Sequence, residues 1–293
     1  MMKNVFTNFL LGLLCVCIVS CEKMAIDESP LSSDEATIVF QVSMYTQTPL
    51  GVSARRSRVS VNEVCSRITY GLFQGEEKVK VVSQVSGDEG FGTLSLTLPL
   101  GEYQLVVVAH NGLGNATITS PDKITFPNNK CTNTFYAYQE FSVKEDTAFD
   151  ISLKRAVALF RLVVEDPIPS DVVQMKFYYT GGSSTFNSVS GYGCVNSKQT
   201  EYRNVDDEMR QGGGLFDLYT FPHAVKDTLK MTVTALSDNE ATVKERTFSV
   251  IPVEINSITQ YSGTFFETSM GESDLDIHFE VDTTWVQYSK YHY

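Results

Sequence analysis

The chain has 293 residues, of which 42% are hydrophobic, and its formal net charge is −12 at pH 7. Such an acidic chain is poorly suited to nucleic acid, because phosphate binding needs clusters of Lys and Arg. Of the six cysteines only Cys65, Cys131 and Cys194 lie beyond residue 21, which allows one disulfide at most among them, and the apolar content is ample for cores without cross-links.

An apolar segment near the start predicts export. One positive charge, Lys3, precedes the almost wholly apolar run Val5–Val19. That run is shorter than the ~20 residues of a good membrane span, so residues 1–20 are interpreted as a signal peptide. It ends in Ile18-Val19-Ser20-Cys21, which resembles the lipobox of bacterial lipoproteins. In such proteins the cysteine receives a diacylglyceryl group and the signal peptide is cut before it.

Cys21 is therefore the expected lipidation site, and two or three acyl chains would anchor the protein stably. An ordinary secretory signal followed by a free cysteine is the alternative. After Cys21 the sequence stays polar and acidic to Glu35 and has no periodic apolar pattern, so residues 21–35 are expected to form a flexible tether.

From residue 36 onward, apolar and polar residues alternate. Apolar side chains share one face of Ile38–Met44, Leu94–Leu98 and Tyr103–Ala109. Later runs of the same kind are Val157–Val164, Gln174–Tyr179, Leu229–Ala235, Phe248–Ile251 and Ile277–Val281. Period-two segments separated by turn residues indicate antiparallel sheets with one buried face. The predicted fold class is all-β, with tandem immunoglobulin-like β-sandwiches and no helix beyond two or three turns.

The length exceeds that of a typical single domain. The polar segment Val143–Asp150 precedes a strongly apolar strand and marks the expected boundary. This predicts an N-terminal β-sandwich at 36–150 and a C-terminal β-sandwich at 151–293. Between Leu98 and Tyr103 a Pro and a Gly predict a turn that feeds a strand, and the Tyr103 hydroxyl is expected to find a backbone partner.

No catalytic motif stands out, so the chain is predicted not to be an enzyme and to need no cofactor. The histidines have no metal-ligand spacing, and His110 and His278 fall on the polar faces of predicted strands. No metal site is expected; at Asp206-Asp207-Glu208 a solvated acidic loop is favoured over a calcium site. A hydrolase whose carboxylates converge from distant positions is a third-ranked alternative.

Two segments are unusual. Arg55, Arg56 and Arg58 form the only dense basic cluster and follow the first strand. They form either a solvated loop or a site for an Arg-directed protease, whose cut would detach Ile38–Met44 from its sheet. The C-terminal segment Asp282–Tyr293 is rich in β-formers and could pair with a sheet edge, its own or a neighbour's, through Trp285, Val286, Tyr288 and Tyr291.

These features together resemble a family. A lipobox, two β-sandwiches and Leu-Pro-x-Gly-x-Tyr-x-Leu at Leu98–Leu105 look like the fimbrillins of type V pili. Leu153–Leu162 is similar to the start of their second domain. Phe177–Asn187, followed by Ser190-Gly191-Tyr192-Gly193 and Gln199, looks most like the fimbrial anchor and minor-subunit branch.

The resemblance implies a pair of transthyretin-like sandwiches and assembly by β-strand addition, in which backbone ladders supply affinity. In polymerising members an Arg-specific protease removes the first strand, and a strand of a neighbouring subunit fills the hydrophobic groove that is left. Anchor members keep their lipid and their first strand. Carried over, Cys21 is the lipid attachment, Arg55, Arg56 or Arg58 are cleavage candidates, and Trp285–Tyr293 is the candidate donor segment.

The first hypothesis is an outer-membrane, surface-exposed lipoprotein that acts as a fimbrial anchor or minor subunit and supports cell adhesion. Its expected partners are other fimbrial subunits and the outer membrane, and the sequence leaves open whether it also binds a glycan or a host-surface ligand. The second is a surface glycan-binding lipoprotein of a nutrient-uptake system. The sequence leaves open whether the subunit is anchor, stalk or tip, whether the Arg cluster is cleaved, and whether Cys65 and Cys131 pair.

Overall fold

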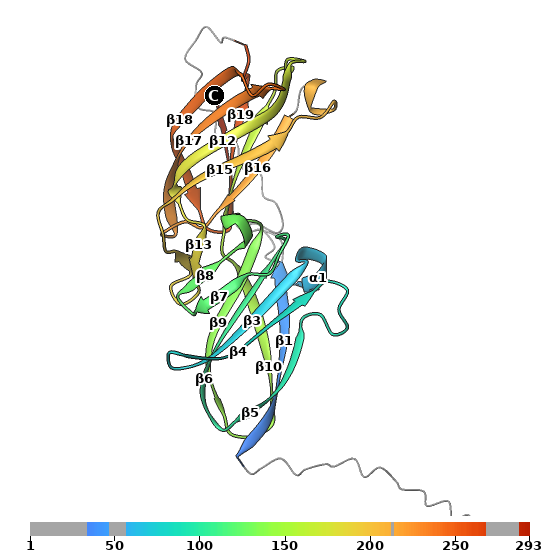
Figure 1. The fold of residues 1–293 in the computed structure, drawn as a ribbon, viewed down its shortest axis with the longest axis vertical. Coiled ribbons are helices and arrows are strands. Elements are labelled where there is room, and N and C mark those ends of the chain that lie inside the picture. The colour runs from blue at the N-terminus through green and yellow to red at the C-terminus, as the bar shows by residue number, and fades with distance from the viewer. Residues whose placement is uncertain (1–33, 47–56, 212–213, 268–286) are drawn as a thin grey trace, which may run out of the picture. The chain divides into compact units, whose positions relative to one another are not determined.

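The computed structural model describes residues 34–46, 57–211, 214–267 and 287–293. Within them are twenty strands, one helix of four residues, α1 (Val61–Val64), and the 3-10 turns Pro127–Asn129 and Met209–Gln211. The all-β prediction is confirmed. Glu35–Tyr293 forms one compact unit, and its strands are shown in Figure 1.

Strand β1 lies inside the first sandwich. This sandwich consists of β1 (Glu35–Thr46), β2 (Ser57–Val59), β3 (Arg67–Gln74), β4 (Glu77–Val85), β5 (Thr93–Pro99), β6 (Gly101–His110), β9 (Thr134–Val143) and β10 (Thr147–Arg155). β1 pairs in parallel with β10 on one edge and antiparallel with β5 and β2 on the other. The facing layer has the order β9-β6-β3-β4, and only two residue pairs join β9 to β10.

The second sandwich contains β11 (Ala158–Val164), β12 (Val172–Gly182), β15 (Ser197–Asn204), β16 (Gly214–Thr220), β17 (Lys226–Ser237), β18 (Thr242–Glu254), β19 (Ser257–Gly263) and β20 (Gln287–His292). One layer has the order β16-β11-β19-β20 and the other β15-β12-β17-β18. Here too the first strand lies between two others. β11 pairs in parallel with β19 and antiparallel with β16, as β1 pairs with β10 and β5.

The two sandwiches therefore repeat one topology. Strands β1, β3, β4, β5, β6, β9 and β10 correspond in order and pairing to β11, β12, β15, β16, β17, β18 and β19. Strand β20 has no counterpart in the first sandwich among the residues that the structure describes. The same order of seven strands thus occurs twice, with β2 added in the first sandwich and β20 in the second.

A short fourth sheet joins the two repeats. It has the order β14-β13-β8-β7, with β7 (Thr117–Ser120) and β8 (Lys123–Thr125) from the first repeat and β13 (Thr185–Asn187) and β14 (Tyr192–Gly193) from the second. A separate hydrophobic cluster lies beneath it and includes Val108, Ile124 and Phe186. This shared core explains why the two sandwiches form a single compact unit.

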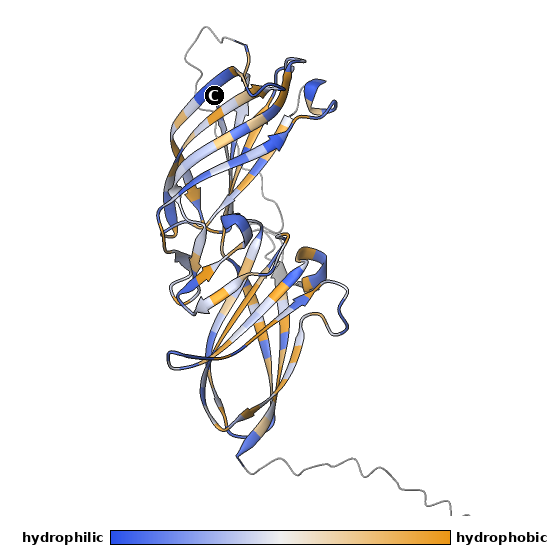
Figure 2. Cartoon of the chain, viewed as in Figure 1, coloured by the Kyte–Doolittle hydropathy of each residue, from blue (hydrophilic) through white to orange (hydrophobic). Residues whose placement is uncertain are grey.

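Alternation along the strands follows the predicted pattern where one face meets solvent. In β5, Leu94, Leu96 and Leu98 are buried and the residues between them are exposed; Figure 2 shows such alternation as orange bands separated by paler ones. The Tyr103 hydroxyl donates to the Pro99 carbonyl oxygen at 3.0 Å, as the turn sequence predicts. The acidic segment before Asp150 forms the β9–β10 turn and the start of β10, which continues to Arg155.

The placement of His110 on a polar strand face is wrong. His110 is fully buried, as are the five residues before it in β6. This end of β6 is covered on one face by the core of the first sandwich and on the other by the shared cluster. An alternating pattern predicts a polar face only where one face of the strand contacts solvent, and at this end of β6 neither face does.

Candidate functional site

The first candidate site is the slot that β1 occupies. Its backbone is paired on both edges: Ile38 to Met44 run along Thr147 to Leu153 of β10, and Glu35 to Gln41 run along β5. Beyond Gln41 the β5 ladder ends, and Met44 to Thr46 pair with β2 instead. A strand paired in this way leaves two unsatisfied edges behind if it is removed.

The side chains of β1 fill the core of the first sandwich. Ile38, Phe40, Val42 and Met44 point inward and are buried. Phe40 meets the rings of Phe141 and Phe149, with centroids 5.4 and 5.8 Å away. Burying these four side chains is worth roughly 6–12 kcal/mol relative to leaving them in water. An empty slot would therefore expose an apolar groove that another strand with alternating apolar residues could fill.

The basic cluster connects β1 to β2. Arg58 belongs to β2, where its backbone pairs with Tyr45. Arg55 and Arg56 lie outside the described residues. In the sequence Arg55 and Arg56 follow β1 and precede β2, so a cut after either would separate β1 from the rest of the chain, and a cut after Arg58 would fall within β2.

The C-terminal segment forms the second candidate site. β20 pairs in parallel with β19, with Ile258 opposite Tyr288 and Ser262 opposite His292. Its outer edge has no partner strand among the described residues. Trp285 and Val286 lie outside the described residues. In this structure the segment thus adds to its own sheet as the last strand.

Aromatic contacts pack the end of β20 and the residue after it against the second sandwich. The Tyr291 ring centroid lies 4.9 Å from that of Tyr261, and Tyr293 meets Phe248 edge-on at 5.2 Å. The Tyr293 hydroxyl donates to the Val163 carbonyl oxygen at 3.2 Å. Burial raises the pKa of the Tyr293 hydroxyl well above its usual value. It therefore stays a neutral donor throughout the physiological pH range.

The cysteines fall into separate environments. Cys65 and Cys131 are buried, belong to different hydrophobic clusters and carry free thiols, and Cys194 is free and exposed. Burial raises the pKa of the Cys65 thiol to about 12 and that of Cys131 further, so both are held as neutral thiols. Cys21, the signal peptide and the tether up to residue 33 lie outside the described residues, and Glu35, expected in the tether, is the first residue of β1. No helix of the described part is long and apolar enough to span a bilayer.

Within the described residues, no three His, Cys, Asp or Glu side chains gather as metal ligands. His223 pairs with Asp227, with Nδ1 3.0 Å from Oδ2, while His278 lies outside the described part. In the acidic loop, Asp206 accepts the backbone N–H of Met209 at 2.9 Å. That contact closes a turn.

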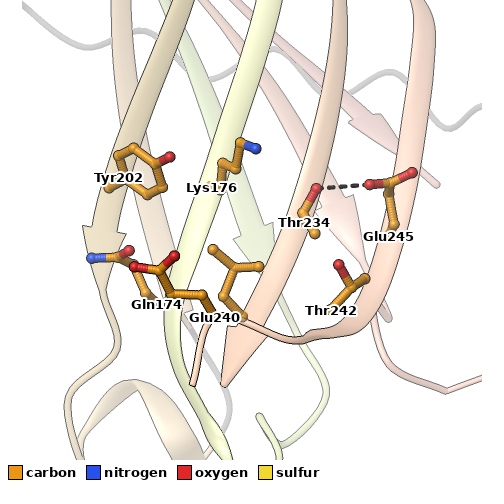
Figure 3. Close-up of a pocket in the computed structure, with 8 residues that line it drawn as sticks. Gln174, Lys176, Tyr202, Thr234, Glu240, Thr242 and Glu245 are labelled. Atoms are coloured by element: carbon orange, nitrogen blue, oxygen red, sulfur yellow. Dashed lines mark hydrogen bonds between the residues drawn. The ribbon is translucent and has the colours of Figure 1, made fainter. Parts of the chain in front are cut away.

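Sequence reasoning missed a third feature, a polar groove on the outer face of the sheet β15-β12-β17-β18 (Figure 3). The side chains that line it are Gln174, Lys176, Tyr202, Thr234, Leu236, Glu240, Thr242 and Glu245. They come from four strands and one turn. The outward positions of each strand can be read from its alternation, but the register that aligns four strands cannot.

Comparisons with known proteins place the chain in a family. Comparison with curated sequences gives no match. Among solved structures, the fimbrial anchor protein Mfa2 from Porphyromonas gingivalis is 11% identical, with 72% of this chain and 82% of that chain covered and a TM-score of 0.41. A candidate adhesin from Bacteroides ovatus is 13% identical, with coverage of 75% and 84% and a TM-score of 0.49. A candidate cell adhesion protein from Bacteroides eggerthii is 12% identical, with coverage of 88% and 98% and a TM-score of 0.42.

A comparison with family profiles matches residues 61–287 to the fimbrillin-A associated anchor proteins Mfa1 and Mfa2. The match begins just after β2 and takes in β3 to β19, whereas β1, β2 and all but the first residue of β20 lie outside it. Because it extends over well more than half of the 293 residues, this chain belongs to that family of fimbrial anchor proteins.

Proposed function

We propose that this protein is a lipid-anchored outer-membrane subunit, acylated at Cys21, that anchors fimbriae or serves as a minor subunit and joins other subunits by β-strand addition. Family membership supports a fimbrial anchor or adhesin-like role with other fimbrial subunits as partners. The observation that carries the strand-addition part is the position of β1, which is paired on both edges and fills the core.

The two candidate sites have different roles in this proposal. A retained β1 keeps the slot between β5 and β10 closed, so no other strand can enter the first sandwich. β20, by contrast, is an edge strand held by one ladder. Its release would present alternating β-forming residues to the slot of another subunit, where a second ladder is available. An anchor would therefore act as a donor and not as an acceptor.

The mature N-terminus tests the anchor role. Mass spectrometry of the protein from membranes should give an acylated Cys21 followed by an uncut tether and β1. A chain that begins just after Arg55, Arg56 or Arg58 would instead identify a polymerised subunit. An unmodified Cys21 in an intact chain would contradict the lipid anchor.

A disulfide staple tests whether β1 must leave. Thr37 and Thr97 are directly opposite each other in the antiparallel β1–β5 pair, where Cα atoms lie about 4.5–5.5 Å apart and within disulfide range. We expect Thr37→Cys/Thr97→Cys, in a Cys194→Ser background, to leave fimbriae attached to cells. The Thr97→Cys single variant is the control. Detachment of fibres that is reversed by a reductant would show that β1 release is required and would overturn the anchor assignment.

A further inference from the structure

The polar groove of the second sandwich is built by two aligned rows of side chains. In the first row, Tyr202 of β15 is opposite Lys176 of β12, which is opposite Thr234 of β17, which is opposite Glu245 of β18. The second row contains Gln174 and Leu236, two residues along β12 and β17, and Thr242, three residues along β18 because the register shifts there. Each side chain is thus fixed by a backbone ladder and not by a loop.

The groove is a real hollow in the sheet face. Thr234 and Leu236 form its floor and are only 6% and 8% exposed, although the described residues place no element over this face. Glu240 closes one end from the β17–β18 turn, where its φ is +61°, and Tyr202 stands at the other side (Figure 3). The hollow measures about 540 Å³, within the roughly 300–1,000 Å³ of small-molecule sites.

Hydrogen-bonding groups of both kinds face the groove. Lys176 offers an ammonium and Gln174 an amide, and Glu240 and Glu245 offer carboxylate oxygens. The Thr234 hydroxyl donates to Glu245 at 2.9 Å and leaves the other carboxylate oxygen to a ligand. Within the described residues, neither Lys176 nor Glu240 has an ion-pair partner. One cation and two anions at short spacing disfavour phosphate and polyanions, and the carboxylates are too few for a metal cluster.

An aromatic surface borders these polar groups. Tyr202 is 49% exposed, and its neighbour Tyr178, in the next row of β12, is 39% exposed on the same face. Tyrosine rings combine an apolar face with a polar tip and suit ligands that have both characters. The C–H faces and hydroxyl edges of a sugar ring have that combination, and a neutral sugar carries no charge that the two carboxylates would repel.

We propose that this groove binds a short neutral oligosaccharide. Tyr202 packs against the face of one sugar ring. The Glu240 and Glu245 carboxylates accept hydrogen bonds from sugar hydroxyls, and Lys176 and Gln174 donate to them. The site is independent of β1 and β20, so a subunit that anchors fibres by strand addition could also hold a surface glycan.

The test uses the whole mature protein on an array of neutral oligosaccharides alongside sialylated and sulfated ones, followed by calorimetric titration of the best hit. We expect retention of neutral glycans and at least a tenfold loss of affinity in Tyr202→Ala and in Glu245→Gln. Tyr192→Ala, an equivalent change on β14 outside the groove, should keep the affinity within twofold. Thermal melting should be unchanged in all three, because each side chain is partly exposed.

Several results would overturn the proposal: no neutral glycan retained, a preference for the acidic glycans, or affinity that both groove variants leave intact. Failure here is separate from failure of the anchor role. Fibre attachment in Tyr202→Ala cells should equal that of the parent, and the acylation and β1 experiments do not involve the groove.

Discussion

The carboxylate of Asp166 accepts the backbone N–H of Phe265 at 2.7 Å. The same carboxylate accepts the N–H groups of Phe266 and Glu267 at 2.7 and 2.8 Å. Asp166 follows β11 and is 3% exposed, and the three N–H groups follow β19. One buried side chain thus fixes the direction in which the chain leaves the sheet on its way to β20.

Asp166→Ala should therefore be strongly destabilising. Its loss leaves three backbone N–H groups without their acceptor, including that of the fully buried Phe265. Unsatisfied buried donors cost about 1–3 kcal/mol each, and such losses are not additive. We expect the free energy of unfolding to fall by about 3 kcal/mol in urea denaturation. Asp171→Ala, which removes a carboxylate from an exposed turn, is the control and should change it by less than about 0.5 kcal/mol.

Tyr103→Phe tests the turn that leads into β6. The variant keeps the ring, which stacks against Phe141 with centroids 5.7 Å apart, and removes only the hydrogen bond to Pro99. We expect a loss of about 1 kcal/mol in urea denaturation, typical of one such bond. Tyr138→Phe removes an exposed hydroxyl contact to Glu140 and should have a smaller effect. Equal losses in the two variants would mean that the burial of Tyr103 does not strengthen its hydrogen bond.

The strands that could be predicted are those with one wet face. Ile38–Met44 and Leu94–Leu98 alternate because the core takes every second side chain, and this signal is local. Burial at the end of β6 could not be predicted, because the covering residues come from the shared cluster, more than a hundred residues away in the case of Phe221. Sequence alternation reports the faces of a strand but not what lies over them.

The candidate sites divide in the same way. The basic cluster and the aromatic C-terminus are unusual as sequence and could be found without a structure. The groove could not, because Lys176 and Glu245 face the same hollow only through the register of three strands. Pairing register depends on long-range packing. The parallel pairing of β20 with β19 could not be predicted for the same reason, since parallel neighbours are not joined by a hairpin that would set their register.

Thiol reactivity should separate the three cysteines of the folded part. Cys194 is exposed, whereas Cys65 and Cys131 are buried, and burial raises the thiol pKa of all three, most in the two buried ones. The thiolate is the reactive form. In a colorimetric thiol assay at pH 8 we expect one reactive group in the native protein and three in denaturant, and Cys194→Ser should abolish the native signal. A denatured protein with only one reactive group would indicate a Cys65–Cys131 disulfide and contradict the structure.

A staple between β19 and β20 tests the donor strand. Thr259 and Ser289 are register partners in that parallel pair. Oxidised Thr259→Cys/Ser289→Cys, in a Cys194→Ser background, should lose co-purification with fimbriae extracted from membranes in detergent, because the segment can no longer leave its sheet. A reductant should restore it, and the Ser289→Cys single variant should behave like the parent. Undiminished co-purification of the oxidised double variant would exclude β20 as the donor.

Buried His110 should make the protein sensitive to mild acid. Its Nδ1 accepts the backbone N–H of Gly112 at 2.9 Å, and its ring meets that of Phe126 edge-on. Burial, with a smaller contribution from the positive charge of Arg67, lowers the pKa of the imidazole to about 4. Near pH 5 the unfolded chain therefore binds a proton there that the folded protein does not, so stability falls as the pH drops below about 6.5 and levels off below about 4.

The size of this effect follows from the two pKa values. Between pH 7 and pH 5 the expected loss attributable to His110 is about 2 kcal/mol, since one unit of pKa corresponds to about 1.4 kcal/mol. Urea denaturation at both pH values measures it. His110→Gln cannot take up a proton at this position, so it should lose about 2 kcal/mol less on acidification. It should be less stable than the parent at pH 7, because the buried ring is lost. If the two proteins lose the same amount, His110 is protonated in the folded state and the buried, neutral imidazole described above is incorrect.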